Sequence, residues 1–259
     1  MNLRVTLVQQ SLVWQDPAAN LAHLDALLAP LQGSTDVIVL PEMFPTGFSM
    51  EVEKLSEPVN GPTTKWLEAK ARELNSAITG SLITKDGDHY YNRMLWVTPG
   101  AQTKHYDKRH LFRMANEHHR FSPGDEPVSL EWRGFRICPQ VCYDLRFPVF
   151  ARRRPELEYD VLIYIASWPA ARRQAWRALL KARAIENISY VVGVNRIGRD
   201  GNKLDYVGDS VAHDFFGESL VDLGAESAVS TVELDGDALR AFRERFPAHL
   251  DADRFSLEP

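Results

Sequence analysis

The chain has 259 residues, of which 44% are hydrophobic, so it can bury a large core, and we expect a single α/β domain over residues 1–259. Its 30 basic and 35 acidic residues give a net charge of −5, which argues against binding to nucleic acid. The chain begins directly in a strand-like segment, contains no apolar run near about 18 residues and has only two cysteines. We therefore expect a cytoplasmic protein that does not interact with membranes.

Strands and helices are expected to alternate through the first half of the chain. Asp16 is a suitable helix N-cap, and Pro17 suits the first helical position. The apolar stripe of this helix comprises Leu21, Leu24, Leu28 and Leu31. A further helix is expected at 61–75, and strands are expected at 3–9, 36–40, 77–84, 90–98 and 103–106, the last two around the turn Pro99-Gly100.

The second half continues this alternation. The run Phe135–Val141 is typical of a core strand, and Pro148 suits the first turn of a helix after it. Strands are expected at 160–165 and 190–195, with a helix at 172–187 between them and shorter strands through residue 232. Asp235 would cap a last helix, whose apolar stripe is Leu239, Phe242 and Phe246. The tail 247–259 has few helix signals and is interpreted as an interface arm.

Three short motifs place reactive side chains at the ends or edges of separate elements. Cys142 directly follows the strand 135–141, where a nucleophile projects from the rim of a sheet and turn N–H groups can face an oxyanion. Glu42 lies just past the apolar run 37–40, and Lys108 lies in a short polar stretch. Taken singly, these residues also fit a buried apolar thiol, a rim carboxylate and a solvated lysine. Together they indicate an active site.

Other catalytic arrangements fit the sequence poorly. Cys138 and Cys142 are not in a Cys-x-x-Cys motif, so Cys138 is interpreted as a core residue. The chain has no Gly-x-Gly-x-x-Gly motif and no P-loop, so no nucleotide cofactor is expected. No metal is expected either, because neither HExxH nor a Cys/His ligand set matches the spacing of the clustered histidines. These are His105, His110, His118 and His119.

Four segments together identify a family. They are L-P-E-M-F-P-T-G-F, Y-D-K-R-H-L-F-R-M-A-N-E, V-C-Y-D-L-R-F-P and A-R-A-I-E-N, in this order. On these segments the chain resembles the nitrilase (carbon–nitrogen hydrolase) superfamily from Val5 to about Phe246, and within it the bacterial omega-amidase branch. The resemblance implies a four-layer αββα sandwich of two stacked mixed sheets with helices outside, no cofactor and a homodimer. Asp36 and Asp160, each of which leads an apolar strand, fit such a two-sheet arrangement.

The resemblance also implies roles for the motif residues. Cys142 is the expected nucleophile, Glu42 the general base, and Lys108 the electrostatic partner of the sulfur and the oxyanion. An unperturbed thiol has a pKa of about 8.5, so a neighbouring ammonium would favour the thiolate. The backbone N–H of Tyr143 is the expected second donor to the oxyanion.

A second glutamate also fits the family's pattern, whereas two segments depart from it. Glu117 and Phe121 fit the family's Glu-x-x-x-Phe spacing, and Glu117 is expected to orient Lys108 or the hydrolytic water. At 166–169 the chain reads Ala-Ser-Trp-Pro, where relatives usually have Asn before the Trp. At 214–217 it reads Asp-Phe-Phe-Gly in place of Asp-Pro-x-Gly. Neither departure touches the catalytic residues.

Candidate substrate contacts are chosen by charge. An acyl chain that ends in a carboxylate needs a cationic partner in a buried pocket. Arg146 lies four residues past the nucleophile, Arg113 and Arg120 flank the second glutamate, and Trp168 is a candidate apolar wall. Arg146 is as well suited to pair with Asp144 and brace the turn.

The expected activity is the hydrolysis of small carboxylated amides, such as 2-oxoglutaramate or 2-oxosuccinamate, to the dicarboxylic acid and ammonia through a cysteine acyl-enzyme. Two alternatives stay open. One is hydrolysis of nitriles or N-carbamoyl compounds, and the other is a non-catalytic protein that binds a ligand in the same pocket. The intact set of Glu42, Lys108 and Cys142 argues against the second, because a binding pocket does not need all three.

Overall fold

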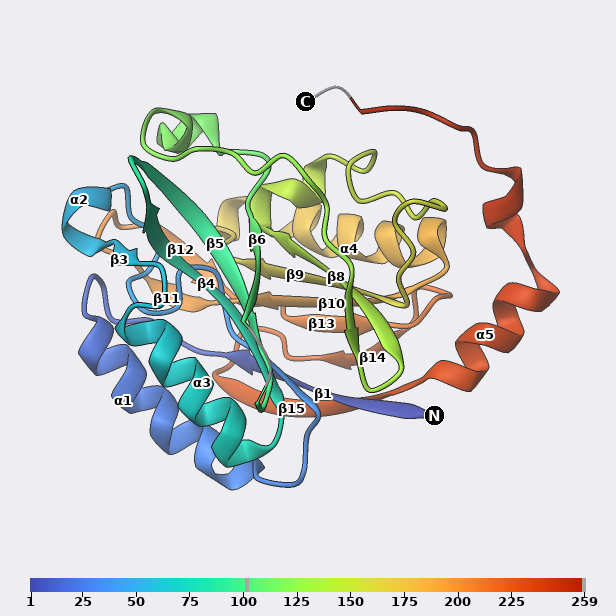
Figure 1. Cartoon of the computed structure of the whole chain (residues 1–259), viewed down its shortest axis with the longest axis horizontal. Helices are drawn as coiled ribbons and strands as arrows, with labels where there is room; N and C mark the ends of the chain where they lie inside the picture. The colour runs from blue at the N-terminus through green and yellow to red at the C-terminus, as the bar shows by residue number, and fades with distance from the viewer. Residues whose placement is uncertain (101–102, 258–259) are drawn as a thin grey trace.

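Two β-sheets stack face to face between outer helices in a computed structural model of the protein, which describes residues 1–100 and 103–257 (Figure 1). The main apolar core lies between the sheets, and two further clusters lie between each sheet and its own helices. The four-layer αββα sandwich expected from the sequence is therefore confirmed.

The first sheet contains β1 (Asn2–Gln9), β2 (Val37–Val39), β3 (Glu57–Pro58), β4 (Ala77–Asp86), β5 (His89–Val97), β6 (Lys104–Asp107) and β15 (Ala228–Asp235). Its order is β15-β1-β2-β4-β5-β6, with β3 paired to β4. β1, β2 and β4 run parallel, whereas β15, β5 and β6 join by antiparallel pairing. These strands agree with the expected ones to within two residues at almost every end.

The second sheet contains β7 (Leu130–Trp132), β8 (Phe135–Val141), β9 (Val161–Ala166), β10 (Tyr190–Asn195), β13 (Val211–His213) and β14 (Ser219–Asp222). Its order is β14-β13-β10-β9-β8-β7, and its centre of β8, β9 and β10 is parallel. A separate hairpin pairs β11 (Ile197–Arg199) with β12 (Asp205–Val207). In β9, Ile163 and Ile165 face the core between the sheets, while Leu162 and Tyr164 face the outer helix. Both faces are covered, so the strand is apolar throughout.

The outer helices are α1 (Pro17–Leu28) and α3 (Pro62–Leu74) on the first sheet and α4 (Arg173–Asn187) on the second, with the short α2 (Val52–Leu55) and the C-terminal α5 (Gly236–Arg245) elsewhere (Figure 1). Asp16 caps α1 as expected, accepting from the Ala19 N–H at 3.0 Å. Leu24 and Leu28 are buried, so the apolar face of α1 is the predicted one. Asp235 caps α5 in the same way.

Two expectations need correction. No α-helix follows β8: the chain forms a 3₁₀ turn at Cys142–Arg146, and Pro148 lies beyond it in a further turn. The stripe of α5 ends early, because Phe246 lies past the helix and is 54% exposed. The tail contains a 3₁₀ turn at Ala248–Asp251, and its last two positions lie outside the described residues, as does the continuation of the Pro99-Gly100 turn.

Candidate active site

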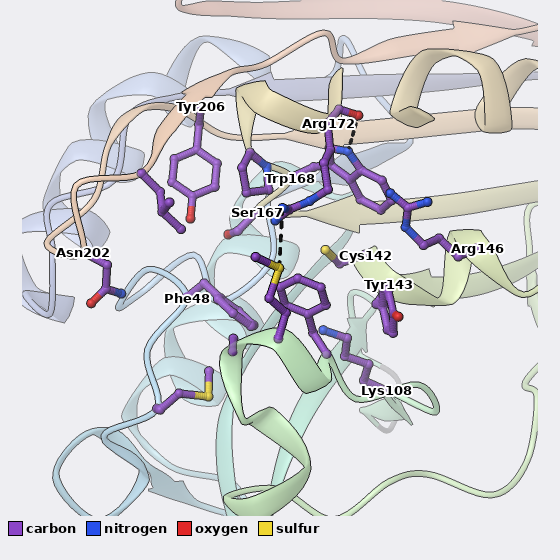
Figure 2. A pocket seen from close by; sticks show the side chains of 16 residues that line it. Phe48, Lys108, Cys142, Tyr143, Arg146, Ser167, Trp168, Arg172, Asn202 and Tyr206 are labelled. Carbon is purple, nitrogen blue, oxygen red and sulfur yellow. Dashed lines mark hydrogen bonds between the residues drawn. The ribbon is translucent and has the colours of Figure 1, made fainter. Parts of the chain in front are cut away.

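Glu42, Lys108 and Cys142 meet at one edge of the sandwich. Glu42 follows β2, Lys108 follows β6 and Cys142 follows β8. β2 and β6 belong to one sheet and β8 to the other, so residues 100 positions apart converge where these strands end. The sequence-based grouping of the three residues is thus reproduced in space, with Cys142 and Lys108 facing the same pocket (Figure 2).

Lys108 is held between two carboxylates. Its Nζ lies 2.9 Å from Glu42 Oε1 and 2.9 Å and 3.0 Å from the two carboxylate oxygens of Glu117. All three side chains have no solvent exposure. A fully buried ion cluster is costly to assemble unless every member is paired, which is the case here. Glu117 therefore orients Lys108 directly.

Both carboxylates are also fixed by neutral donors. Asn92 Nδ2 donates to Glu42 at 2.8 Å and to Glu117 at 3.3 Å. The Ser167 N–H donates to Glu42 Oε2 at 2.8 Å, and the Phe112 N–H donates to Glu117 Oε2 at 2.6 Å. Sequence reasoning did not identify Asn92. The signal was available, since Asn92 is the one amide side chain of β5 and lies where the strand becomes buried.

The charges of this cluster set the proton states. Burial opposes the ammonium of Lys108, but the charges of Glu117 and Glu42 outweigh it and hold the pKa of Lys108 well above its usual value. Burial raises the pKa of Glu117, although Lys108 opposes this rise. Burial and the negative charge of Glu42 raise the pKa of the Cys142 thiol well above its ordinary value, despite the attraction of Lys108. Lys108 favours the thiolate, as expected, but burial and the charge of Glu42 outweigh it, so the sulfur keeps its proton.

Cys142 occupies a strained turn. It has φ of 49°, in the left-handed region that residues other than glycine rarely adopt. The turn leads from β8 straight into the 3₁₀ segment, where the first N–H groups have no partner earlier in the helix. Tyr143, the residue after Cys142, supplies one of these N–H groups. Cys138, by contrast, is fully buried in the core under α4, and burial raises its thiol pKa to about 12.

A cavity of about 420 Å³ opens onto Cys142. Its walls are mostly aromatic and apolar (Figure 2). The lining residues are Phe48, Met50, Lys108, Phe112, Met114, Ala115, Cys142, Tyr143, Arg146, Ser167, Trp168, Pro169, Arg172, Asn202, Leu204 and Tyr206. Few polar groups in an apolar pocket favour a small ligand bound in one orientation.

Two arginines lie in this lining on the wall that carries Trp168 (Figure 2). The Arg146 guanidinium lies 5.0 Å from the Trp168 ring centre, and that of Arg172 lies 5.2 Å from the Phe112 ring centre. Arg172 is not among the substrate contacts chosen from the sequence. Its side chain lines the cavity only because of the tertiary structure, which places the end of the 3₁₀ turn before α4 at the cavity wall.

The other arginine candidates lie elsewhere. Arg113 is exposed and is not part of the cavity lining, and Arg120 pairs with Glu53 at 2.6 Å beside a neighbouring cavity. Within the described ranges, the partners of Asp144 are other than Arg146, so the suggested brace between these two residues is not formed.

The departures noted in the sequence have structural explanations. The Ser167 hydroxyl donates to the Glu42 carbonyl at 3.3 Å, so the Ala-Ser-Trp-Pro segment holds Glu42 in place. Asp214 accepts from the N–H groups of Phe216 and Glu218, both at 2.9 Å, so the second segment builds a tight turn far from the cavity.

The clustered histidines make separate contacts. His110 contacts Asp144, and the rings of His118 and His119 lie 3.9 Å apart. Over residues 1–100 and 103–257, no three metal-binding side chains are grouped to share an ion. Over the same residues, none of the helices has the length and apolar character needed to cross a bilayer.

Comparisons with known proteins agree with this geometry. The carbon–nitrogen hydrolase family matches residues 4–244. The chain is 49% identical over 256 residues to the omega-amidase YafV of Escherichia coli K12, and the match covers 98% of each protein. It is 29% identical over 254 residues to a 2-oxoglutaramate amidase of Bacillus subtilis, and this match covers 97% of this chain and 98% of that protein. A crystal structure of a carbon–nitrogen hydrolase superfamily protein from Xanthomonas campestris, which carries an arsenic adduct in its active site, superposes with a TM-score of 0.97 at 48% identity over the full length of both chains.

A more distant relative shares the fold. Nit3 of Saccharomyces cerevisiae, of the nitrilase superfamily, superposes with a TM-score of 0.83 at 24% identity over 95% of this chain and 94% of its own. The family match spans nearly the whole chain, and two stacked sheets bring the buried Glu42 and Lys108 and the half-buried Cys142 together. The protein therefore belongs to the carbon–nitrogen hydrolase family.

Proposed function

We propose that the protein is a thiol amidase of the omega-amidase type, which hydrolyses small carboxylated amides to the dicarboxylic acid and ammonia. The observation that carries the proposal is the fully buried cluster of Glu42, Lys108 and Glu117 beside the half-buried thiol of Cys142, at the base of a cavity that two arginines line. The names of the relatives, omega-amidase and 2-oxoglutaramate amidase, support the choice of substrate class.

Acylation begins from the neutral thiol. Cys142 Sγ attacks the amide carbonyl carbon while its proton passes to Glu42, which suits a thiol whose pKa is raised. The resulting oxyanion is stabilised by Lys108, which keeps its charge because its own pKa is raised, and by the N–H of Tyr143. Glu42 then returns the proton to the departing nitrogen, the C–N bond breaks, and ammonia leaves a thioester on Cys142.

Deacylation repeats these roles with water as the nucleophile. Glu42 takes a proton from the water, whose oxygen attacks the thioester carbonyl. Collapse of the second tetrahedral intermediate breaks the C–S bond, releases the carboxylic acid and returns the proton to sulfur. Glu117 keeps Lys108 in place throughout, with its Oε2 at 2.9 Å from Nζ. Glu42 gives up each proton that it takes within one turnover.

The far end of the acyl chain is assigned to the arginine wall. Arg146 and Arg172 point their guanidinium groups into the aromatic cavity, where a carboxylate would form charge-assisted hydrogen bonds. Trp168 forms the apolar wall between them. Arg172 thus takes the place of Arg113, a sequence-based candidate that lies outside the cavity lining.

The test of the proposal is ammonia release from a panel of 2-oxoglutaramate, 2-oxosuccinamate, neutral amides, nitriles and ureido acids. We expect the two carboxylated amides to have the highest kcat/KM. A preference for nitriles or ureido acids would contradict the amidase assignment, and no turnover of any compound by folded protein would favour the non-catalytic alternative.

We propose, further, that the protein acts in the cytoplasm as a homodimer. Both thiols are free, which fits a reducing compartment. Apolar side chains on the C-terminal segment, with Leu250 75% exposed and Phe246 54% exposed, suit a surface that a second copy covers. Light scattering of the purified protein would separate a dimer from a monomer, and truncation after Arg245 would test the contribution of the tail.

A further inference from the structure

Asp144 holds the backbone around the nucleophile. It lies two residues past Cys142 and is fully buried, with 1% exposure. Its Oδ2 accepts a hydrogen bond from the Val141 N–H at 2.9 Å. This bond links the residue before Cys142 to a residue after it, and so closes the turn in which Cys142 has a positive φ. The strained conformation of the nucleophile is therefore held by the carboxylate of Asp144.

The same carboxylate reaches the other sheet, on both sides of Lys108. The Tyr106 hydroxyl donates to Oδ2 at 2.8 Å. His110 donates to Oδ1 through its backbone N–H at 2.9 Å and through ring Nδ1 at 2.8 Å. Tyr106 belongs to β6 of the first sheet, whereas Asp144 follows β8 of the second. One carboxylate thus joins the two loops whose separation sets the distance from the Lys108 ammonium to the sulfur.

The His110 ring is itself held in place. It stacks on Phe147 with ring centres 4.0 Å apart and planes 10° apart, and meets Phe150 edge-on at 5.5 Å. A carboxylate only accepts hydrogen bonds, so Nδ1 carries the proton in this contact. Phe147 also contacts Tyr143, the proposed oxyanion donor, at 5.1 Å. The stacked ring therefore braces both the Lys108 loop and the turn after Cys142.

We propose that Asp144, together with Tyr106 and His110, is a positioning residue that holds Cys142 and Lys108 in register across the two sheets. Asp144 does not line the cavity, and it acts by fixing the sulfur and the ammonium relative to each other. The kinetic consequence rests on the proposed amidase function, whereas the effect on thiol reactivity does not. A misplacement of about 1 Å between reacting groups lowers the rate roughly 100-fold.

The principal variant is Asp144→Asn. The side-chain shape is kept, but one acceptor oxygen becomes an NH₂ group that faces N–H and O–H donors. We expect kcat to fall about 30- to 100-fold while KM changes less than about threefold, because the cavity walls are intact. A purely structural role would lower the melting temperature without this split between kcat and KM.

The matched control is Asp160→Asn. Asp160 is also a buried aspartate of the second sheet, and it accepts from the Arg136 N–H at 2.9 Å and from Arg243 at 2.7 Å, but at the opposite end of the strands. Both variants are expected to lose thermal stability. Only Asp144→Asn is expected to lose turnover, so equal kcat values for the two variants would overturn the proposal.

Two milder changes keep the test decisive if Asp144→Asn does not fold. His110→Ala removes the ring donor, and His110→Asn restores an N–H near the position of Nδ1. We expect kcat to fall about tenfold in His110→Ala. His110→Asn should recover about half of this loss on a logarithmic scale, and Tyr106→Phe should show a smaller loss than His110→Ala. Identical kcat values for all three variants and wild type would refute the positioning role.

Thiol alkylation separates this proposal from the amidase assignment. The rate of iodoacetamide modification of Cys142, followed by mass spectrometry of its peptide, depends on proton transfer to Glu42 and on the field of Lys108, but not on any amide substrate. We expect that rate to fall about tenfold or more in Asp144→Asn and to stay unchanged in Asp160→Asn. If wild type hydrolyses no amide, the amidase function fails, and these two alkylation rates still decide the positioning role. Equal rates would overturn it.

Discussion

The two ends of the parallel strands carry buried carboxylates in opposite electrostatic settings. At the amino ends, Asp36 before β2 accepts from Arg4 at 2.8 Å, 2.9 Å and 3.1 Å and also pairs with Arg133. At the carboxyl ends, Glu42 and Glu117 share the single ammonium of Lys108. Cationic side chains outnumber the carboxylate at Asp36, whereas two carboxylates outnumber the one ammonium at Lys108.

The pKa values follow this difference. Burial opposes ionisation of Asp36, but hydrogen bonds and charge from Arg4 and Arg133 outweigh it and hold the pKa of Asp36 below its usual value. At the other end, burial raises the pKa values of Glu117 and Cys142, and the negative charge of Glu42 adds to both rises. Asp36 at the amino end thus holds a fixed charge that stabilises the fold. At the carboxyl end, the raised pKa values of Glu117 and Cys142 suit the proton transfers of the proposed reaction.

The largest expected effect comes from the nucleophile. Cys142→Ala should lower kcat by at least about 10⁴-fold with the fold intact, because Cys142 supplies the thiol that forms the proposed acyl-enzyme. Cys138→Ala should keep most activity, since Cys138 packs in the core. Turnover assays and iodoacetamide labelling read by mass spectrometry check both. Preferential labelling of Cys138 with activity retained would contradict the assignment.

Lys108→Arg sharpens the electrostatic part of the comparison. A planar guanidinium cannot occupy the compact site between two carboxylates and still reach the oxyanion. We expect kcat to fall roughly 10²- to 10³-fold. Lys70→Arg is the matched control, because Lys70 pairs with Asp25 and Glu73 on the outer helices. A Lys108→Arg enzyme with wild-type kcat would rule out the contact role.

Removing the arginine wall should affect charged substrates selectively. Arg146→Ala and Arg172→Ala are compared on 2-oxoglutaramate and on a neutral amide of similar length. Loss of a charge-assisted contact should cost roughly 2–4 kcal/mol, or about 30- to 1,000-fold, in kcat/KM on the charged substrate alone. Arg120→Ala, which breaks a pair with Glu53 outside this cavity, should have no effect. Equal losses on both substrates would make the arginines structural.

The smallest kinetic effect is expected at the other end of the strands. Asp36→Asn should lower the free energy of unfolding by roughly 1–3 kcal/mol at pH 7 and leave kcat within about twofold. Because the pKa of Asp36 is depressed in the folded state, its contribution is complete above the unfolded pKa and is lost as pH falls through the folded pKa. In thermal melts from pH 7 down to about pH 2, the difference between wild type and variant should therefore shrink toward the acid end. A constant difference would contradict this origin.

Local sequence rules determined most of the elements. The Asp16 and Asp235 caps, the apolar run of β9 and the motif around Cys142 depend on contacts within a few residues, so they were readable from the chain. The α-helix expected after Cys142 was wrong because Asp144 bonds backward to Val141 and across to β6, which holds a 3₁₀ turn instead.

Tertiary structure alone decided the charge balance and the walls of the site. The motifs named Glu42, Lys108, Glu117 and Cys142, but not that burial together with an excess of negative charge would leave the sulfur protonated. Nor could the sequence separate Arg172, in the cavity, from Arg113, outside it. Desolvation and the direction of a side chain both depend on which surfaces pack together from distant parts of the chain, and no spacing along the sequence contains that information.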